Sequence, residues 1–137
     1  MNWVLDTSVT MAWCFDDERT AKTDELLDQL AQNSGLVVPQ IWSLEVANVL
    51  LTAAKKGRIT PAKRRQFLTL LESARISVDM VAPNIVFNEV FNLADKYQLI
   101  SYDASYLELA MRRGLPLATL DKALKRAAMA AGISILT

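Results

Sequence analysis

Four acidic residues carry most of the chemistry that this chain could perform, because the sequence contains no histidine. Asp6 and Asp121 each follow a short apolar run, Asp103 precedes a helical pattern, and Glu45 lies inside an apolar helical pattern. Singly, each aspartate is explained as a helix N-cap, and Glu45 as part of a solvent-facing polar stripe that includes Asn48. Gathered at one place in the fold, the four would form a metal site made of carboxylates.

Such a site suits hydrolysis assisted by a hard, oxygen-preferring cation, Mg²⁺ or Mn²⁺. The absence of histidine excludes the Ser-His-Asp and Cys-His nucleophile systems, as well as histidine-ligated zinc. Crowded carboxylates repel one another, so at least one of the four should have a raised pKa in the metal-free protein. Ser8 and Thr119 each lie two residues from an aspartate, where a hydroxyl can hydrogen-bond to a carboxylate or serve as a cap or turn residue.

The elements that must position these residues alternate between strand and helix, which predicts one α/β domain over residues 1–137. We expect a mainly parallel five-stranded sheet with helices on both faces. In such sheets, ligands bind beyond the carboxyl ends of the strands, where Asp6 and Asp121 are predicted to lie. The predicted strands are residues 2–6, 36–38, 76–81, 117–120 and 133–136, and the predicted helices are 17–32, 40–56, 61–74, 83–97, 104–113 and 122–131.

The composition limits the classes of function. Fifteen basic residues balance fifteen acidic ones, so the overall charge does not indicate a nucleic-acid-binding protein. The chain is 52% hydrophobic but has no apolar run of membrane-spanning length and starts without a signal-peptide pattern, so we expect a soluble cytoplasmic protein. The single cysteine, Cys14, cannot form an intramolecular disulfide and is expected to be a small buried residue. Four large apolar residues are expected either in the core or, in part, beneath a partner: Met11, Trp13, Phe15 and Trp42.

Four segments, in their order and spacing, resemble the motifs of PIN-domain ribonucleases, specifically the VapC-type toxins of bacterial toxin-antitoxin modules. These segments are residues 4–8, 45–48, 101–107 and 117–124. The resemblance implies a catalytic site that comprises Asp6, Glu45, Asp103 and Asp121 and binds Mg²⁺ or Mn²⁺.

Within that site, the resemblance implies metal binding by Asp6, Asp103 and Asp121. Asp6 and Asp103 are favoured as direct ligands, whereas Glu45 and Asp121 are suited to water-mediated contact or to orienting the nucleophile. Ser8, Thr119 and Asn48 are expected to support these acids. Some members of the family carry a further acidic or amide residue shortly after the last aspartate, where this chain has residues 123–125 (Ala-Leu-Lys), so the number of metal ions stays open.

The resemblance further implies an RNA substrate, products with 5′-phosphate and 3′-hydroxyl ends, a homodimer, and a cognate antitoxin that covers the acidic cleft. No membrane association is expected, because no apolar run has membrane-spanning length. Three alternatives remain at this point. The chain could be a PIN nuclease of RNA processing outside a toxin module, or a PIN-like scaffold without catalysis. It could also be a magnesium-binding receiver-type signalling domain, although it lacks the paired acids and the lysine of that class.

Overall fold

The computed structural model describes residues 2–32 and 35–137, and within these residues four parallel strands form one sheet. The strands are β1 (Asn2–Leu5), β2 (Gly35–Pro39), β3 (Ile76–Asp79) and β4 (Leu117–Ala118), in the spatial order β3-β2-β1-β4. All three strand pairs are parallel, so the carboxyl ends of the strands lie along one edge. The predicted parallel α/β architecture is therefore confirmed.

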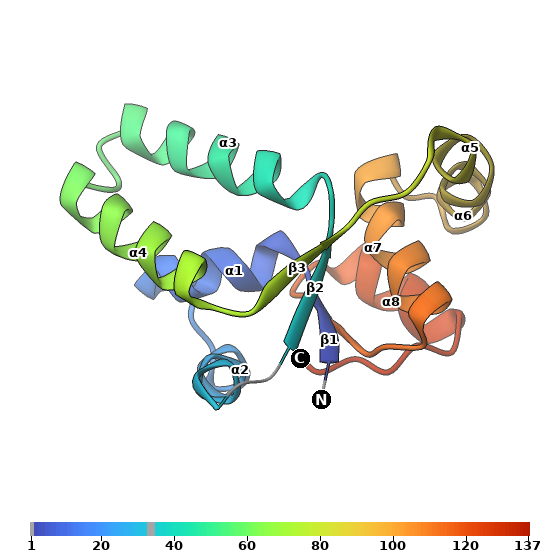
Figure 1. Cartoon of the computed structure of the whole chain (residues 1–137), viewed down its shortest axis with the longest axis horizontal. Helices are drawn as coiled ribbons and strands as arrows, with labels where there is room; N and C mark the ends of the chain where they lie inside the picture. The colour runs from blue at the N-terminus through green and yellow to red at the C-terminus, as the bar shows by residue number, and fades with distance from the viewer. Residues whose placement is uncertain (1, 33–34) are drawn as a thin grey trace.

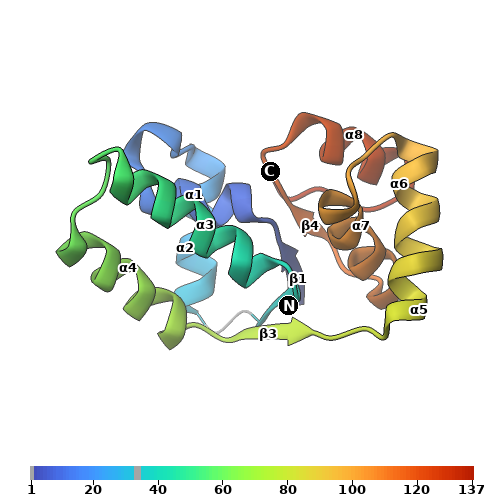
Figure 2. The same cartoon turned by 90° about the horizontal axis from the view of Figure 1, so that it is seen from above.

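Helices cover both faces of this sheet, as predicted (Figures 1 and 2). One group consists of α1 (Thr7–Cys14), the 3₁₀ helix η1 (Asp16–Glu18), α2 (Ala21–Ala31), α3 (Trp42–Lys55) and α4 (Pro61–Ser73). The other consists of α5 (Pro83–Ile85), the π-helical turn η2 (Val86–Val90), α6 (Phe91–Tyr97), α7 (Ser101–Arg113) and α8 (Lys122–Ala130). Among the described helices, none combines the length and the apolar character that a bilayer crossing requires.

The fifth strand predicted at residues 133–136 is wrong. Ile135 forms only an isolated parallel bridge with Leu117. The bridge is held by the Leu117 amide, which donates to the Ser134 carbonyl at 2.9 Å, and by the Leu136 amide, which donates to the Leu117 carbonyl at 3.0 Å. Because β4 itself has only two residues, it offers too little strand edge for a longer ladder.

Helix α1 was not predicted, although it begins directly after the strand that carries Asp6. Its sequence contains Thr7, Val9 and Thr10, which are β-branched and therefore weak helix formers. Burial of most of the helix decides the conformation instead: Val9 and Thr10 are fully buried against the sheet. Helix α7 begins at Ser101, three residues earlier than expected, so Asp103 lies in its first turn.

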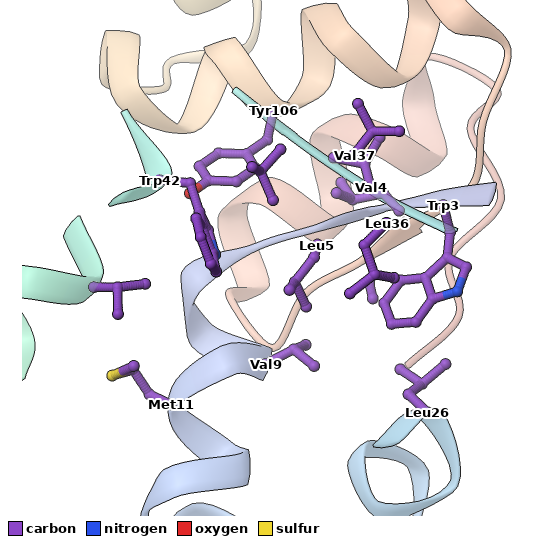
Figure 3. Packing of buried hydrophobic residues seen from close by; sticks show 14 of the residues in the cluster. Trp3, Val4, Leu5, Val9, Met11, Leu26, Leu36, Val37, Trp42 and Tyr106 are labelled. Carbon is purple, nitrogen blue, oxygen red and sulfur yellow. The ribbon is translucent and has the colours of Figure 1, made fainter. Parts of the chain in front are cut away.

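The core lies on both sides of β1, because successive side chains of a strand point to opposite faces (Figure 3). Trp3 and Leu5 point toward the layer of α1 and α2, whereas Val4 points toward α7 and Tyr106 (Figure 3). The large apolar residues left open above belong to the core: Met11, Phe15 and Trp42 are buried, and Trp13 packs against the core with its ring edge-on to Trp3 at 6.4 Å.

Candidate active site

Asp6 lies at the carboxyl end of β1, immediately before α1, and only 6% of its surface is exposed. Its amide donates to the Ala118 carbonyl at 3.0 Å, which aligns the end of β1 with the end of β4. Its carboxylate oxygen Oδ2 accepts hydrogen bonds from Ser8 Oγ at 2.6 Å and from Thr119 Oγ1 at 2.7 Å. Although Asp6 is the N-cap residue of α1, its side chain makes no capping hydrogen bond, so capping does not explain this carboxylate.

The two hydroxyls that hold Asp6 are themselves fixed by backbone amides. The Leu120 amide donates to Ser8 Oγ at 2.9 Å, and the Asp121 amide donates to Thr119 Oγ1 at 3.0 Å. Each hydroxyl therefore accepts one hydrogen bond from the β4–α8 connection and donates one to Asp6. This arrangement ties the turn after β1 to the turn after β4 and sets the orientation of the Asp6 carboxylate.

Glu45 reaches the same region from α3. Its oxygen Oε1 accepts a hydrogen bond from the Tyr106 hydroxyl at 2.6 Å, and Thr7 Oγ1 lies 3.1 Å from the same oxygen. The Thr7 and Tyr106 hydroxyls are 2.8 Å apart, so Glu45 joins α1, α3 and α7. The solvent-stripe explanation fails for Glu45, whereas Asn48 is exposed and hydrogen-bonds to none of the four acids within the described residues. The supporting role of Asn48 stays a prediction.

Asp103, in the first turn of α7, is half-buried and feels the charges of the other three acids. Burial, followed by repulsion from Asp121, Asp6 and Glu45, raises the pKa of Asp103 to about 6. Asp121 is the N-cap of α8 and accepts a hydrogen bond from the Leu124 amide at 3.0 Å, so the capping explanation holds for this residue. The four predicted acids thus share one electrostatic environment, and one of them also serves the fold.

The pKa values of the two remaining acids follow the same direction. Burial raises the pKa of Asp6, and hydrogen bonds from Ser8 and Thr119 offset part of that effect. Burial also raises the pKa of Glu45, to which the charge of Asp6 adds. At least one carboxylate therefore has a raised pKa, as expected, but burial is the larger cause, and repulsion between the acids adds to it at Asp103 and Glu45.

Thr7 and Tyr106 are site residues that sequence reasoning missed. Burial and the charge of Asp6 raise the pKa of Tyr106, so its hydroxyl keeps its proton and donates to Glu45. The available signals were weak: Thr7 directly follows Asp6, and Tyr106 lies three residues after Asp103, within one helical turn.

The protein itself does not neutralise this group of acids. Among residues 2–32 and 35–137, no lysine or arginine forms an ion pair with any of the four. In the same part of the chain, no three acidic side chains are close enough to hold an ion by themselves. The donor set still fits a hard cation that keeps several of its waters, because Mg²⁺ is commonly held by one or two carboxylates with water in its other positions.

The chain matches the model of the PIN domain family over residues 3–129. It is 28% identical over 124 residues to Ribonuclease VapC3 of Pyrobaculum aerophilum, a match that covers 90% of this chain and 92% of that protein. The crystal structure of PAE2754 from Pyrobaculum aerophilum is similar, with a TM-score of 0.73, 25% identity, and coverage of 99% of this chain and 90% of the other. The fold is shared with the crystal structure of VapBC2 from Rickettsia felis, which is bound to a DNA fragment from the VapBC2 promoter. The TM-score is 0.61 and the identity 16%, and the match covers 98% of this chain and 97% of the other.

Proposed function

This chain belongs to the PIN domain family, and on that premise we propose that it is a metal-dependent endoribonuclease, the toxin of a toxin-antitoxin pair. The observation that carries the proposal is the group of acids contributed by the end of β1, by α3 and by α7: the pKa values of Asp6, Glu45 and Asp103 are raised, and no basic residue among those described neutralises them. Similarity to Ribonuclease VapC3 supports the choice of RNA as substrate. We further infer that residues 1–137 act as one domain.

In this proposal, Asp6, Asp103 and Asp121 hold Mg²⁺ or Mn²⁺, with Asp6 and Asp103 as the direct ligands. When bound, the cation supplies a water of lowered pKa and neutralises charge on the phosphate and on the leaving oxygen. Ser8 and Thr119 keep the Asp6 carboxylate in one orientation, because both hydroxyls donate to the same oxygen.

Glu45 is proposed to orient the attacking water. The hydroxyls of Tyr106 and Thr7 both lie against Oε1, and within the described residues no hydrogen bond reaches Oε2. Oε2 is therefore the oxygen that can accept a proton from water. Tyr106 and Thr7 act as positioning residues, since they fix the carboxylate and do not contact the reacting atoms.

The proposed partners are RNA, a cognate antitoxin and a second copy of the chain. Leu44 and Leu51 are large, exposed and seven residues apart on α3, so they lie on one side of that helix. An exposed apolar side of a helix suits a partner surface. The toxin-antitoxin complex from Klebsiella pneumoniae has the same fold, with a TM-score of 0.58 and 18% identity. Light scattering of the purified protein tests the dimer, and a monomer at micromolar concentration would contradict it.

The decisive experiment compares wild type with Asp6→Asn, both after induction in cells and as purified protein. We expect growth arrest and discrete new RNA 5′ ends only with wild type, and cleavage by purified wild type that requires Mg²⁺ or Mn²⁺ and stops with EDTA. Cleavage by Asp6→Asn should fall by about a hundredfold or more, since it removes a ligand of the cation that neutralises the developing charge. Asp95→Asn makes the same chemical change at an exposed position on α6 and should behave as wild type.

The outcomes separate the parts of the proposal. Equal cleavage by wild type and Asp6→Asn would contradict the assigned site. Metal-dependent cleavage by purified protein without growth arrest would support a nuclease outside a toxin module and contradict the toxin assignment.

A further inference from the structure

A cavity of about 220 Å³ lies between the end of β2, the start of α3, the end of β3, η2 and the side of α7 that runs from Ser101 to Arg112. Two α7 residues on its wall, Tyr102 and Ser105, each directly precede a residue of the acidic site, Asp103 and Tyr106. Since successive residues of an α-helix lie about 100° apart around its axis, Tyr102 lies about 40° from Tyr106 and about 100° from Asp103, so it stands at the border between the cavity and the acidic site.

Helix α3 also connects the acidic site with the cavity. Ile41 lines the cavity, and its carbonyl accepts the amide of Glu45 at 3.0 Å, so the cavity wall begins one helical turn before Glu45. Gln40, also on the wall, directly precedes Ile41. A ligand that spanned the acids and the cavity would therefore need to reach only across the starts of α3 and α7.

The lining of the cavity suits a flat, uncharged group. Most of its surface is apolar and comes from residues such as Pro39, Val86 and Leu109. The one cationic side chain on the wall, Arg112, is held by two carboxylates: Nη2 lies 2.5 Å from Asp79 Oδ2, and Nε lies 3.0 Å from Glu108 Oε1. Its charge is thus already neutralised, so the cavity offers no free cation for a phosphate.

The mouth of the cavity combines an aromatic ring with polar groups. Tyr102 is 54% exposed although it lines the cavity, so one part of its ring is open to a ligand. The side chains of Gln40 and Ser101 lie on the same wall and, among the described residues, are engaged in no hydrogen bond. Unpaired RNA bases are commonly recognised by stacking on an aromatic side chain together with hydrogen bonds to their edges.

We propose that this cavity binds the base of a nucleotide adjacent to the scissile phosphate of single-stranded RNA, with Tyr102 as the stacking and specificity-determining residue. The inference rests on the proposed nuclease function and names a feature of its substrate: an unpaired base beside the cleaved bond. The short reach from the cavity to the acids, across the starts of α3 and α7, favours RNA over a protein side chain as its occupant.

The test uses purified full-length protein and a library of single-stranded RNA oligonucleotides whose cleavage sites are sequenced. Tyr102→Ala is expected to raise KM about tenfold with kcat nearly unchanged, and to remove the nucleotide preference at one position beside the cleavage site. Tyr102→Phe keeps the ring and should retain that preference. Phe87→Ala removes an aromatic ring that is 72% exposed and does not line the cavity, so it should match wild type.

A second arm removes the base instead of the ring. An oligonucleotide with an abasic site at the preferred position should be cleaved by wild type as poorly as the intact one is by Tyr102→Ala, and combining both changes should cause no further loss. Additive losses, or cleavage that is indifferent to both changes, would overturn the base site. Unchanged preference with an altered oligomer mass for Tyr102→Ala would assign the cavity to a protein contact and would likewise overturn it.

Binding separates this inference from the proposed function. The Asp6→Asn protein and its Tyr102→Ala derivative are titrated against the same oligonucleotides by fluorescence anisotropy. A tenfold weaker, base-dependent binding on loss of Tyr102, with no cleavage by wild type under any condition, would support the base site and contradict the nuclease. If the wild type cleaves RNA in a metal-dependent way and both variants bind it equally well, the nuclease function is supported and the base site is contradicted.

Discussion

Two aspartates at the carboxyl edge of the sheet are buried to the same extent but have opposite pKa shifts. Asp6 follows β1 and Asp79 ends β3, and each is 6% exposed. Burial raises the pKa of Asp6, and the uncharged hydrogen-bond donors around it, chiefly the hydroxyls of Ser8 and Thr119, offset only part of that effect. Burial also acts to raise the pKa of Asp79, but the guanidinium groups of two arginines outweigh it and hold the value below its ordinary range. Burial alone therefore does not decide the charge of an acid in this fold.

The two aspartates differ in the source of the positive charge that neutralises them. Arg113 Nη2 lies 2.7 Å from Asp79 Oδ1, and Arg112 contacts the other oxygen, so the chain itself neutralises Asp79. Both arginines stand in the last turn of α7, and Asp103 stands in its first turn, where each sign of charge is favoured by the helix dipole. Helix α7 thus carries at its C-terminal end the two arginines that neutralise Asp79. At its N-terminal end it carries Asp103, which no basic residue among those described neutralises. Unneutralised acids with raised pKa values are more typical of a functional site than of a structural one.

The largest test of this contrast removes Asp79. Asp79→Ala should lower the free energy of unfolding of the metal-free protein by about 3 kcal/mol, because it leaves two arginines without their buried acceptor; their partial exposure keeps the loss near the low end of such effects. Urea denaturation measures the change. Asp95→Ala, at an exposed position, should change stability by less than about 0.5 kcal/mol. Equal effects of the two substitutions would mean that the Asp79 group is not a structural ion-pair cluster.

The second test supplies a divalent cation to the acidic site. Mg²⁺ or Mn²⁺ at about 100 times its dissociation constant should stabilise the folded protein by roughly 2.7 kcal/mol, seen as a higher melting temperature. The increment should persist in Asp79→Ala and disappear in the Asp6→Asn, Asp103→Asn double variant. An equal rise in wild type and the double variant would place the bound cation outside the acidic group.

Much of the fold could be predicted from the sequence because the local signals agree with the tertiary structure. The apolar runs that became β1 and β2 are fully or almost fully buried, and Gly35 and Pro39 are the first and last residues of β2. Gly114 ends α7 with a φ of 63°, in the left-handed conformation that a glycine favours after a helix. The prediction of Asp6 at the carboxyl end of a strand followed from these local signals.

The errors arose where a distant contact decides the outcome. The segment that became α1 has weak helix formers, and only its packing against the sheet makes it helical. Residues 133–136 have strand-like composition, but β4 is too short to pair with them. The ion pairs of Asp79 join residues 33 and 34 positions apart in the sequence, and the hydrogen bond from Tyr106 to Glu45 spans 61, so no local pattern could reveal either.

The smallest effect is expected in the pH dependence of stability. It distinguishes the two sites most clearly, because Asp103 and Asp79 should affect the free energy of unfolding in opposite directions. The pKa of Asp103 is about 6 in the metal-free fold, against an ordinary value of 3.8, so between these values the folded protein binds more protons than the unfolded chain. The contribution of Asp103 to stability is therefore present near pH 4, is lost as pH rises to about 6 and stays lost above that.

Asp103→Asn removes this titration. It should match wild type near pH 4 and, without metal, be more stable by about 1 kcal/mol at pH 7, a value well below the full shift because the carboxylate is half-exposed. Asp79→Asn should behave in the opposite way: the lowered pKa of Asp79 stabilises the fold above its unfolded pKa, so the variant loses most at neutral pH and its deficit shrinks on acidification. Urea titrations in EDTA from pH 3 to pH 7 compare both variants with wild type. If both variants have a lower free energy of unfolding than wild type at pH 7, the protein alone stabilises the acidic site, as it does Asp79, and that site does not need a cation.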